Sequence, residues 1–484
     1  MNSEAIDTIQ YLIEQDEFDE AMDFILAVED DFSQDSFFFY LKAYACFRLE
    51  NFDEAVHSYQ RSIELDPTNC AAYSDLGYVL LVQERWDEAE FFIKKAVSMN
   101  PSDPLGIERL GLLYYSMSDL EAARESFLVL FQLGQGSARI YFFLAEIHSS
   151  LEEFKKALFY YDQCLDLDPG NQDAIFGKAL TLESMQEFRE AVELYEALLE
   201  TMEDGDEILD VLVSLAACYF KLENMEKSLS AYSHALQLDP KNPQILNNLG
   251  LLHFEANDLE TAERYLTLSL KEDESFDALF NFGKCHIRNS RLRLALSTFQ
   301  KALRLAEDRV DEREAYFFLG KTYHGLKNPY LALSCLRNSH QLGCDYVELY
   351  LLLLETAELT GKQDEILEIL RKSREKELSY YHSMFLYYMG KRDFRATLKV
   401  LNLGLRKFPE FPVLFYYKAS VYALEGKQTL AVNNLRRAIL GNPEIATMAK
   451  ANACFEALVG QEDFETLIQP KTKTKRKKIN AKNS

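Results

Sequence analysis

The residues of this sequence that could do chemistry are its histidines, cysteines and many carboxylates, and none of them stands in a catalytic or metal-binding pattern. The chain has no glycine-rich phosphate loop, no GxSxG elbow and no HExxH pair. Its eight cysteines are scattered without a CxxC pair, as is typical of small buried side chains. His148, His253 and His286 stand at positions where Tyr or Leu usually packs in this chain, so they are expected to be buried, and metal ligation is the alternative. We therefore expect no catalytic residue, no cofactor, no metal site and no enzyme activity.

One group of amides and cations has types and spacings that suit binding. It consists of Asn247, Asn248, Asn281, Lys284, Arg288 and Lys321. Amides can pair with the backbone of a peptide, and lysine and arginine favour a carboxylate. These residues predict a peptide site, and the alternative is an ordinary solvated polar surface.

The elements that would position this group are predicted by an internal repeat. Pro67 and Pro101 lie 34 residues apart, and Pro169, Pro240 and Pro443 recur in the same context after Asp or Asn. Counting back from each proline returns one template, with small residues at positions 8, 20 and usually 27, and an aromatic residue or leucine at position 24. A period of this length is typical of helical hairpins that stack on their neighbours, because one hairpin cannot bury its own apolar faces.

The template resembles the tetratricopeptide repeat almost position for position in residues 70–103. There it places Leu76-Gly77, Ala89, Ile93 and Pro101. The resemblance implies an all-α fold, a right-handed α-solenoid of about 13 antiparallel helical hairpins with a C-terminal capping helix near 446–459. The hairpins begin near residues 2, 36, 70, 104, 138, 172, 209, 243, 276, 313, 347, 378 and 412. Small residues at positions 8 and 20 would let paired helices approach closely, and the proline would end the second helix.

Irregularities in the register predict the domain organisation. Extra acidic residues enter at 203–207 and 307–312, and Leu354 and Phe385 replace the small residue of position 8. We expect a regular array over 2–346, a less regular continuation over 347–445, a capping helix region over 446–468, and a basic disordered tail over 469–484.

In tetratricopeptide proteins the first helix of each pair lines a concave groove, and the resemblance carries this geometry to the present chain. An aromatic side chain recurs at its groove positions in most copies. Together with the amides and cations, the predicted groove residues are Phe37, Tyr40, Tyr44, Phe47, Tyr78, Phe142, Phe176, Phe220, Phe254, Phe280 and Phe317. The alternative for each ring is packing between adjacent first helices. Leu251, Glu314 and Phe318 stand where the family's two-carboxylate clamp needs polar groups, so binding of chaperone tails is disfavoured.

Charge is distributed unevenly along this acidic protein, whose net charge is −26. From Arg371 onward there are 22 Lys and Arg against 10 Asp and Glu, and before it 30 against 68. This asymmetry suggests head-to-tail self-association or the docking of one acidic and one basic partner, and ordinary solvated surface is the alternative. The basic tail resembles a nuclear-localisation cluster, and a solubilising end explains it as well. We expect no nucleic-acid binding beyond weak contacts through that tail.

No apolar run is long enough to span a membrane, and the first residues lack the pattern of a secretory signal. We expect a cytoplasmic protein, or a nuclear one if the source is eukaryotic. The function we predict is a protein–protein interaction scaffold or adaptor that binds a peptide or amphipathic helix of a partner in the groove. The alternatives are a chaperone-like holder of hydrophobic clients and a substrate-recruiting, non-catalytic subunit of an enzyme complex.

Overall fold

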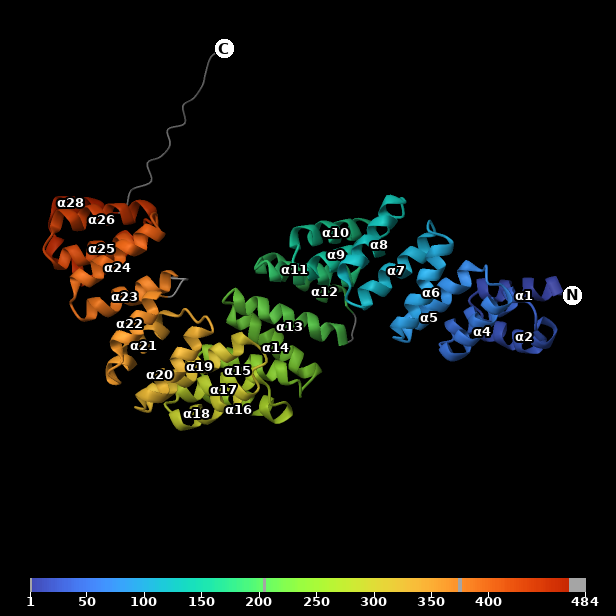
Figure 1. The fold of residues 1–484 in the computed structure, drawn as a ribbon, viewed down its shortest axis with the longest axis horizontal. Helices are drawn as coiled ribbons and strands as arrows, with labels where there is room; N and C mark the ends of the chain where they lie inside the picture. Colours follow the sequence, from blue (N-terminus) through green and yellow to red (C-terminus); the bar gives the residue numbers. More distant parts are fainter. Residues whose placement is uncertain (1, 203–205, 373–376, 470–484) are drawn as a thin grey trace, which may run out of the picture. The chain divides into compact units, whose positions relative to one another are not determined.

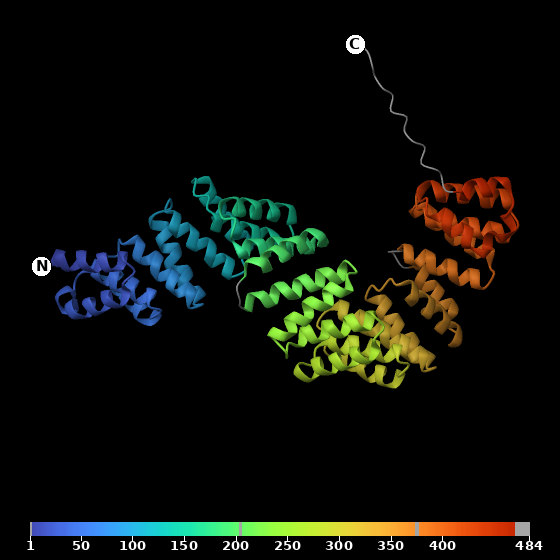
Figure 2. The same ribbon diagram turned by 180° about the vertical axis from the view of Figure 1, so that it is seen from behind.

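In the computed structural model, which describes residues 2–202, 206–372 and 377–469, the chain is a succession of antiparallel helix pairs (Figure 1, and from behind in Figure 2). About 81% of it is helical, and the described residues contain no β-strand. The predicted all-α solenoid of hairpins is confirmed. Two predicted features, the acidic residues at 203–205 and the basic tail from 470 onward, lie outside the described residues.

The chain divides into two compact units, Met1–Asp239 and Pro240–Ser484. The first contains α1 (Asn2–Glu14), α2 (Phe18–Val28), a 3₁₀ turn η1 (Glu29–Phe32), α3 (Ser36–Arg48), α4 (Phe52–Leu65), α5 (Cys70–Val82), α6 (Trp86–Met99), α7 (Pro104–Ser116), α8 (Leu120–Gln132), α9 (Ala138–Ser150), α10 (Phe154–Leu167), α11 (Gln172–Ser184), α12 (Phe188–Thr201), α13 (Asp206–Lys221) and α14 (Met225–Leu238).

The second unit continues the same pairing. It contains α15 (Pro243–Glu255), α16 (Leu259–Glu272), α17 (Phe276–Arg288), α18 (Leu292–Arg304), α19 (Arg309–Gly325), α20 (Pro329–Gln341), α21 (Val347–Leu359), α22 (Gln363–Lys372), α23 (Leu378–Gly390), α24 (Phe394–Lys407), α25 (Pro412–Leu424), α26 (Gln428–Gly441), α27 (Ile445–Ala451), a 3₁₀ turn η2 (Ala453–Leu458) and α28 (Glu462–Ile468).

The described helices from α1 to α26 form 13 successive pairs, and 11 of the first helices begin at the predicted residue. The exceptions are α13 and α19, which begin three and four residues earlier than predicted. For α19 the cause is Asp308, whose carboxylate accepts hydrogen bonds from the backbone N–H groups of Val310 and Asp311. Such a cap satisfies amides that a helix start leaves unpaired, so the extra acidic residues lengthen this helix instead of adding only loop.

The ends of the second helices follow the prolines of the repeat. The helices α4, α6, α10, α14 and α26 each end two residues before Pro67, Pro101, Pro169, Pro240 and Pro443, respectively. Proline has no backbone N–H, and it disfavours a helical conformation in the residue before it. The prolines therefore set where each of these second helices stops.

Close approach within a hairpin depends on glycine at position 8. A Cβ atom added to Gly77 would lie 2.5 Å from Cγ1 of Ile93, and one added to Gly283 would lie 2.6 Å from ring carbons of Phe299. Both distances are far below van der Waals contact. In these two hairpins the small residue predicted at position 8 is thus required by the packing of the paired helix.

The small residue at position 27 has a second use in several hairpins. Ser62, Ser269 and Ser339 each donate a hydrogen bond from Oγ, at 2.8 Å, to the carbonyl oxygen of the residue 26 positions earlier. That earlier residue is the predicted first residue of its hairpin, namely Ser36, Pro243 or Arg313, although α19 itself begins at Arg309. These bonds join the end of the second helix to the start of the first.

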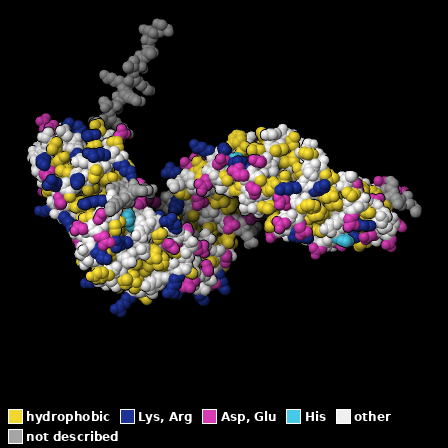
Figure 3. Space-filling model, viewed as in Figure 1, with side chains coloured by type: hydrophobic (Ala, Val, Ile, Leu, Met, Phe, Trp, Pro, Cys, Tyr) yellow, Lys and Arg dark blue, Asp and Glu magenta, His cyan; other side chains and the backbone are white. Residues whose placement is uncertain are grey.

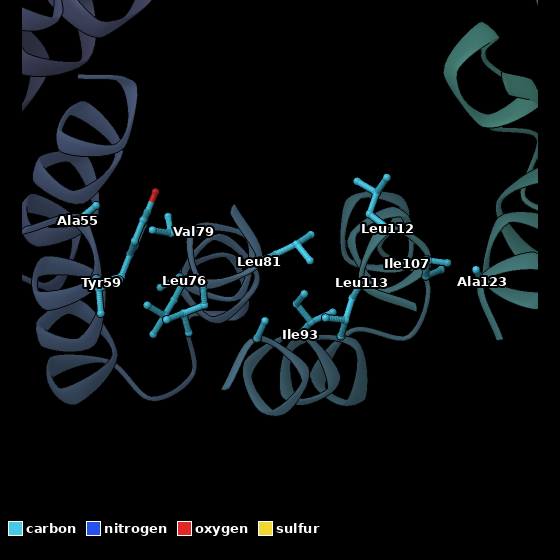
Figure 4. Close-up of a cluster of buried hydrophobic side chains, with 14 of the residues drawn as sticks. Ala55, Tyr59, Leu76, Val79, Leu81, Ile93, Ile107, Leu112, Leu113 and Ala123 are labelled. Atoms are coloured by element: carbon cyan, nitrogen blue, oxygen red, sulfur yellow. The ribbon is translucent and has the colours of Figure 1, made fainter. Parts of the chain in front are cut away.

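The core of each unit is built between the helices. In the first unit, Tyr59 of α4, Leu76 of α5, Ile93 of α6 and Leu113 of α7 are all buried and belong to one continuous cluster, whose side chains point into the space between successive helices (Figure 4). Removing such side chains from water is the main favourable contribution to folding, so each hairpin is stabilised chiefly by its neighbours.

The predicted irregular region departs from the repeat in its packing. Leu354 and Phe385 are buried at position 8, and the ring of Phe385 stacks on Tyr417 with centroids 4.1 Å apart. The stretch expected as a capping helix forms α27, η2 and α28, with Phe455 and Phe464 buried among them. In the space-filling view, Lys and Arg side chains are prominent on the visible face of the C-terminal end of the second unit (Figure 3).

Candidate functional site

The candidate site is the surface formed by the first helices of the hairpins, here called the first-helix face. Within the units, successive first helices contact each other, as α5 does α7 and α15 does α17, more extensively than successive second helices do. First helices that lie closer together than second helices form the inner side of a curve. The first-helix face is therefore the concave side of each unit.

In the first unit the predicted aromatic residues are partly exposed and also packed on one another. Tyr40, Tyr44, Phe47 and Tyr78 are half-buried, and Phe37 is 42% exposed. The rings of Phe47 and Tyr78 meet edge to face with centroids 5.8 Å apart, although they belong to different hairpins. These rings join neighbouring first helices, and part of each ring remains exposed on this face.

A polar network that the sequence did not reveal crosses three hairpins of this face. The Tyr40 hydroxyl donates to Asp75 Oδ2 at 2.7 Å, and Arg109 forms an ion pair with Asp75 Oδ1 at 2.5 Å. Arg109 also donates to Ser74 Oγ at 2.7 Å. The side chains of Asp75 and Arg109 are each only 12% exposed. Burial, with the nearby Asp75 carboxylate, raises the pKa of Tyr40 well above its usual value. The network fixes the register of three successive first helices.

Farther along the first unit, Phe142, Phe176 and Phe220 are half-buried. Phe176 packs against Tyr195 and borders a pocket of about 210 Å³ between α11, α12 and α13. The pocket is lined by Gln172, Asp173, Phe176, Leu198, Met202, Glu207, Asp210 and Val211. Close by in sequence, burial raises the pKa of Glu146, whose carboxylate accepts a hydrogen bond from Tyr161.

In the second unit the predicted aromatic residues are more deeply placed. Phe254 and Phe317 are 5% and 3% exposed, so these two rings contribute to the core more than to the surface. Phe280 is half-buried and meets Phe318 edge to face with centroids 5.0 Å apart. Phe254 and Phe280 thus contribute to the first-helix face mainly as rings on which the side chains of Lys284 and Arg288 pack.

The predicted amides are divided between a structural pair and an unpaired residue. Asn281 of α17 donates from Nδ2 to Oδ1 of Asn247 on α15 at 3.0 Å, and Asn247 is buried. Asn248 is half-buried, and its side chain makes no hydrogen bond within the described part of the chain. Asn248 is therefore the amide of this group that remains available to a ligand.

Two of the three predicted cations are already engaged. Arg288 donates to the backbone oxygen of Phe254 at 2.8 Å, and its guanidinium lies 4.1 Å from the centroid of the Phe254 ring. Lys321 forms an ion pair with Glu348 at 2.7 Å. Both side chains have internal partners that the sequence spacing did not disclose.

Lys284 is different, because it has rings beneath it but no counter-ion. Its ammonium lies 5.1 Å from the centroid of Phe254 and 5.8 Å from that of Phe280. No carboxylate of a described residue lies within 4.0 Å of it. Burial lowers the pKa of Lys284. The site thus offers one amide and one ammonium, on adjacent first helices, to a ligand.

The histidines behave as packing residues in the described structure. His148 and His286 are buried and His253 is half-buried, and His148 stacks on Tyr160 while binding Glu153 through Nδ1 at 2.6 Å. Over the described ranges, no group of three His, Cys, Asp or Glu side chains is arranged to hold a metal ion. Every helix in those ranges is too short or too polar to cross a bilayer.

Stacked hairpins with a concave, side-chain-lined inner face define a protein-interaction scaffold. Models of the tetratricopeptide repeat match residues 138–171 and 247–310, and a TPR repeat model matches residues 43–83 and 218–257. The chain thus contains tetratricopeptide repeats in these segments and is similar to tetratricopeptide repeat proteins. Their fold is typically non-catalytic.

The similar proteins are distant in sequence. The BBSome complex member BBS4 homolog of Drosophila melanogaster is 25% identical over 310 residues, which cover 58% of this chain and 60% of that protein. The human protein O-mannosyl-transferase TMTC1 is 28% identical over 205 residues, or 41% of this chain and 23% of that protein. A solved APC/C hetero-tetramer, Cut9-Hcn1, has a TM-score of 0.39 at 16% identity, with 95% of each chain covered. The chain thus spans less than two thirds of the length of these two curated relatives.

Proposed function

We propose that this protein is a scaffold that binds an extended segment of a partner protein across the first helices α15, α17 and α19. The single observation that carries this proposal is the pair Asn248 and Lys284. Both are half-buried on the first-helix face, and neither has a hydrogen bond or ion pair within the described residues. Polar groups at a partly buried surface are costly when unpaired, so a binding surface is where they are best accommodated.

The chemistry of the pair favours an extended segment. The Asn248 amide has both a donor and an acceptor, which matches one peptide unit of a backbone. The rings of Phe254 and Phe280 beneath Lys284 supply an apolar floor for a side chain of that segment. A polar contact to the backbone and an apolar contact to a side chain are the usual elements of peptide recognition.

Site-specific photo-crosslinking tests this proposal. A photoreactive amino acid replaces Asn248 on α15 in one full-length variant and Leu268 on α16 in the control. Leu268 is a suitable control because it is 42% exposed on a second helix of the same hairpin. We expect adducts to discrete partner segments from position 248 and few from position 268. Equal adduct yields from the two positions would contradict binding on the first-helix face.

The kind of adduct separates the scaffold from the alternatives. A few defined segments of native partners support a scaffold, whereas many unrelated unfolded chains would support a holder of hydrophobic clients. Segments of the substrates of one enzyme, found together with that enzyme, would support a substrate-recruiting subunit.

We also propose head-to-tail self-association, supported by the excess of acids before residue 371 and of cations after it. Sedimentation of the full chain at low and at high salt tests it. We expect association at low salt that is reversed by salt, and a monomer at both ionic strengths would end the proposal.

A further inference from the structure

Lys284 stands out when it is compared with the lysine one hairpin later. Lys284 and Lys321 both occupy position 9 of their hairpins, on α17 and α19. Lys321 is neutralised by Glu348 at 2.7 Å, whereas Lys284 has no carboxylate within ion-pair distance in the described structure. The fold is therefore able to supply a counter-ion to a lysine at this position, and it does not do so for Lys284.

The surroundings of Lys284 make the missing counter-ion costly. The side chain is half-buried over two phenylalanine rings, and its neighbour Arg288 adds a second positive charge. The carboxylates of Glu255 and Glu314 attract it only from beyond ion-pair distance. The two rings stabilise the ammonium in part, but an ammonium removed from water is fully stabilised only by a close anion.

The anion that fits is a single carboxylate. Lys321 is paired with Glu348, and Arg288 keeps its charge while it donates to the Phe254 carbonyl oxygen. Lys284 is therefore the cation of this group that has neither a hydrogen-bond nor an ion-pair partner among the described residues. A doubly charged phosphate is bound best by the paired donors of an arginine, and here the guanidinium of Arg288 is held on the Phe254 ring and the Phe254 carbonyl oxygen. One ammonium beside one amide matches one acidic side chain and the peptide unit next to it.

We propose that Lys284 forms an ion pair with an Asp or Glu side chain of the bound partner segment, while Asn248 hydrogen-bonds the backbone of that segment. The scaffold thus selects acidic segments in its second unit. This inference rests on the proposed peptide-binding function.

A peptide-display selection on the full-length protein tests the inference without a known partner. Random twelve-residue peptides are selected in parallel on the wild-type chain, on Lys284→Gln and on Lys321→Gln, a matched control at the same repeat position. We expect the wild type and Lys321→Gln to enrich peptides with Asp or Glu at one fixed place, and Lys284→Gln to lose that enrichment. A selected acidic peptide should bind Lys284→Gln about tenfold more weakly, as expected for loss of one charge-assisted contact.

The outcomes separate the two proposals. Selection of peptides without an acidic preference, or with a preference that survives in Lys284→Gln, would overturn the inference and leave peptide binding intact. Selection of phosphopeptides over Asp and Glu peptides in a second library would also overturn it. If the wild type selects no peptide at all, the proposed function fails and the inference fails with it. The variant Lys284→Arg, which keeps the charge, should recover most of the acidic preference, and thermal unfolding of each variant shows that it is folded.

Discussion

Asn281 donates a hydrogen bond to the side-chain oxygen of Asn247 at 3.0 Å, and the two residues lie 34 positions apart in the sequence. One repeat length thus separates two amides that meet on adjacent first helices. The bond ties α15 to α17, the two helices that carry Asn248 and Lys284.

Replacing Asn247 with alanine should therefore weaken the fold. The buried oxygen that Asn281 contacts would be lost, leaving its amide unsatisfied, at a cost of about 1 kcal/mol. The corresponding change of Asn248 to alanine should leave the free energy of unfolding nearly unchanged, because Asn248 has no internal hydrogen bond in the described structure. Thermal unfolding of the two variants measures the difference, and equal losses would contradict it.

Asp75 should be the most sensitive polar residue of the first unit. Its removal leaves the Arg109 guanidinium and the Tyr40 hydroxyl without their partner. We expect Asp75→Ala to destabilise the protein by about 3 kcal/mol. The double variant Asp75→Leu with Arg109→Met should lose much less, because no charge is left unpaired. Denaturant unfolding checks both, and additive losses would argue against coupling.

Glycine at position 8 gives a steric prediction with an internal control. Gly283→Ala would place a Cβ 2.6 Å from the Phe299 ring, which should cost about 1–3 kcal/mol by overpacking. Gly390→Ala meets no atom within 4 Å near the end of α23 and should be neutral or slightly stabilising. A neutral Gly283→Ala in thermal unfolding would mean that the paired helices separate easily.

Stability should fall in mildly acidic solution because of His148. Burial lowers the pKa of His148, and this effect outweighs the opposing influence of Glu153, while Lys156 and Arg124 lower it further. The unfolded chain then takes up a proton at this residue before the folded chain does, so stability is lost as pH falls below about 6.5. His148→Gln, which never titrates, should lose less of its melting temperature than the wild type between pH 7 and pH 5. Parallel melting profiles would contradict the assignment.

Replacing Lys284 should change stability and peptide affinity in opposite directions. Lys284→Met should raise the free energy of unfolding by about 0.5 kcal/mol, because an apolar side chain suits the rings of Phe254 and Phe280 better than an unpaired ammonium. The same variant should bind acidic peptides more weakly. Thermal unfolding together with fluorescence anisotropy of a selected peptide measures both. A loss of stability would show that the rings alone suffice to hold the ammonium.

Most of the fold was predictable because the repeat makes each part of it visible many times. The prolines that end second helices and the glycines at position 8 recur in the sequence. Each acts through one dominant physical effect, because proline stops a helix and glycine lets the paired helix approach. The early start of α19 was missed because Asp308 reads equally well as loop and as helix cap until its hydrogen bonds to Val310 and Asp311 are seen. Local composition alone does not distinguish these two roles.

The candidate site was predictable as a group of residues but not as a set of pairs. Which amide or cation has a partner within the chain depends on side-chain conformations. The sequence therefore does not reveal that Asn247 is hydrogen-bonded to Asn281 while Asn248 has no such bond in the described structure. The network of Asp75 and Arg109 was missed, although these opposite charges lie 34 residues apart at the same repeat position. Opposite charges at one position of successive repeats are the signal that would have found it.

The free amide of Asn248 and the free ammonium of Lys284 belong to different hairpins, on α15 and α17. A ligand that uses both must cross the helices instead of lying along one of them. Ligand specificity then depends on which two hairpins are neighbours, because neither hairpin supplies both groups. Insertion of a single hairpin between these two would preserve the stacking and separate the amide from the ammonium, so in this protein specificity can change by recombination of repeats as well as by point substitution.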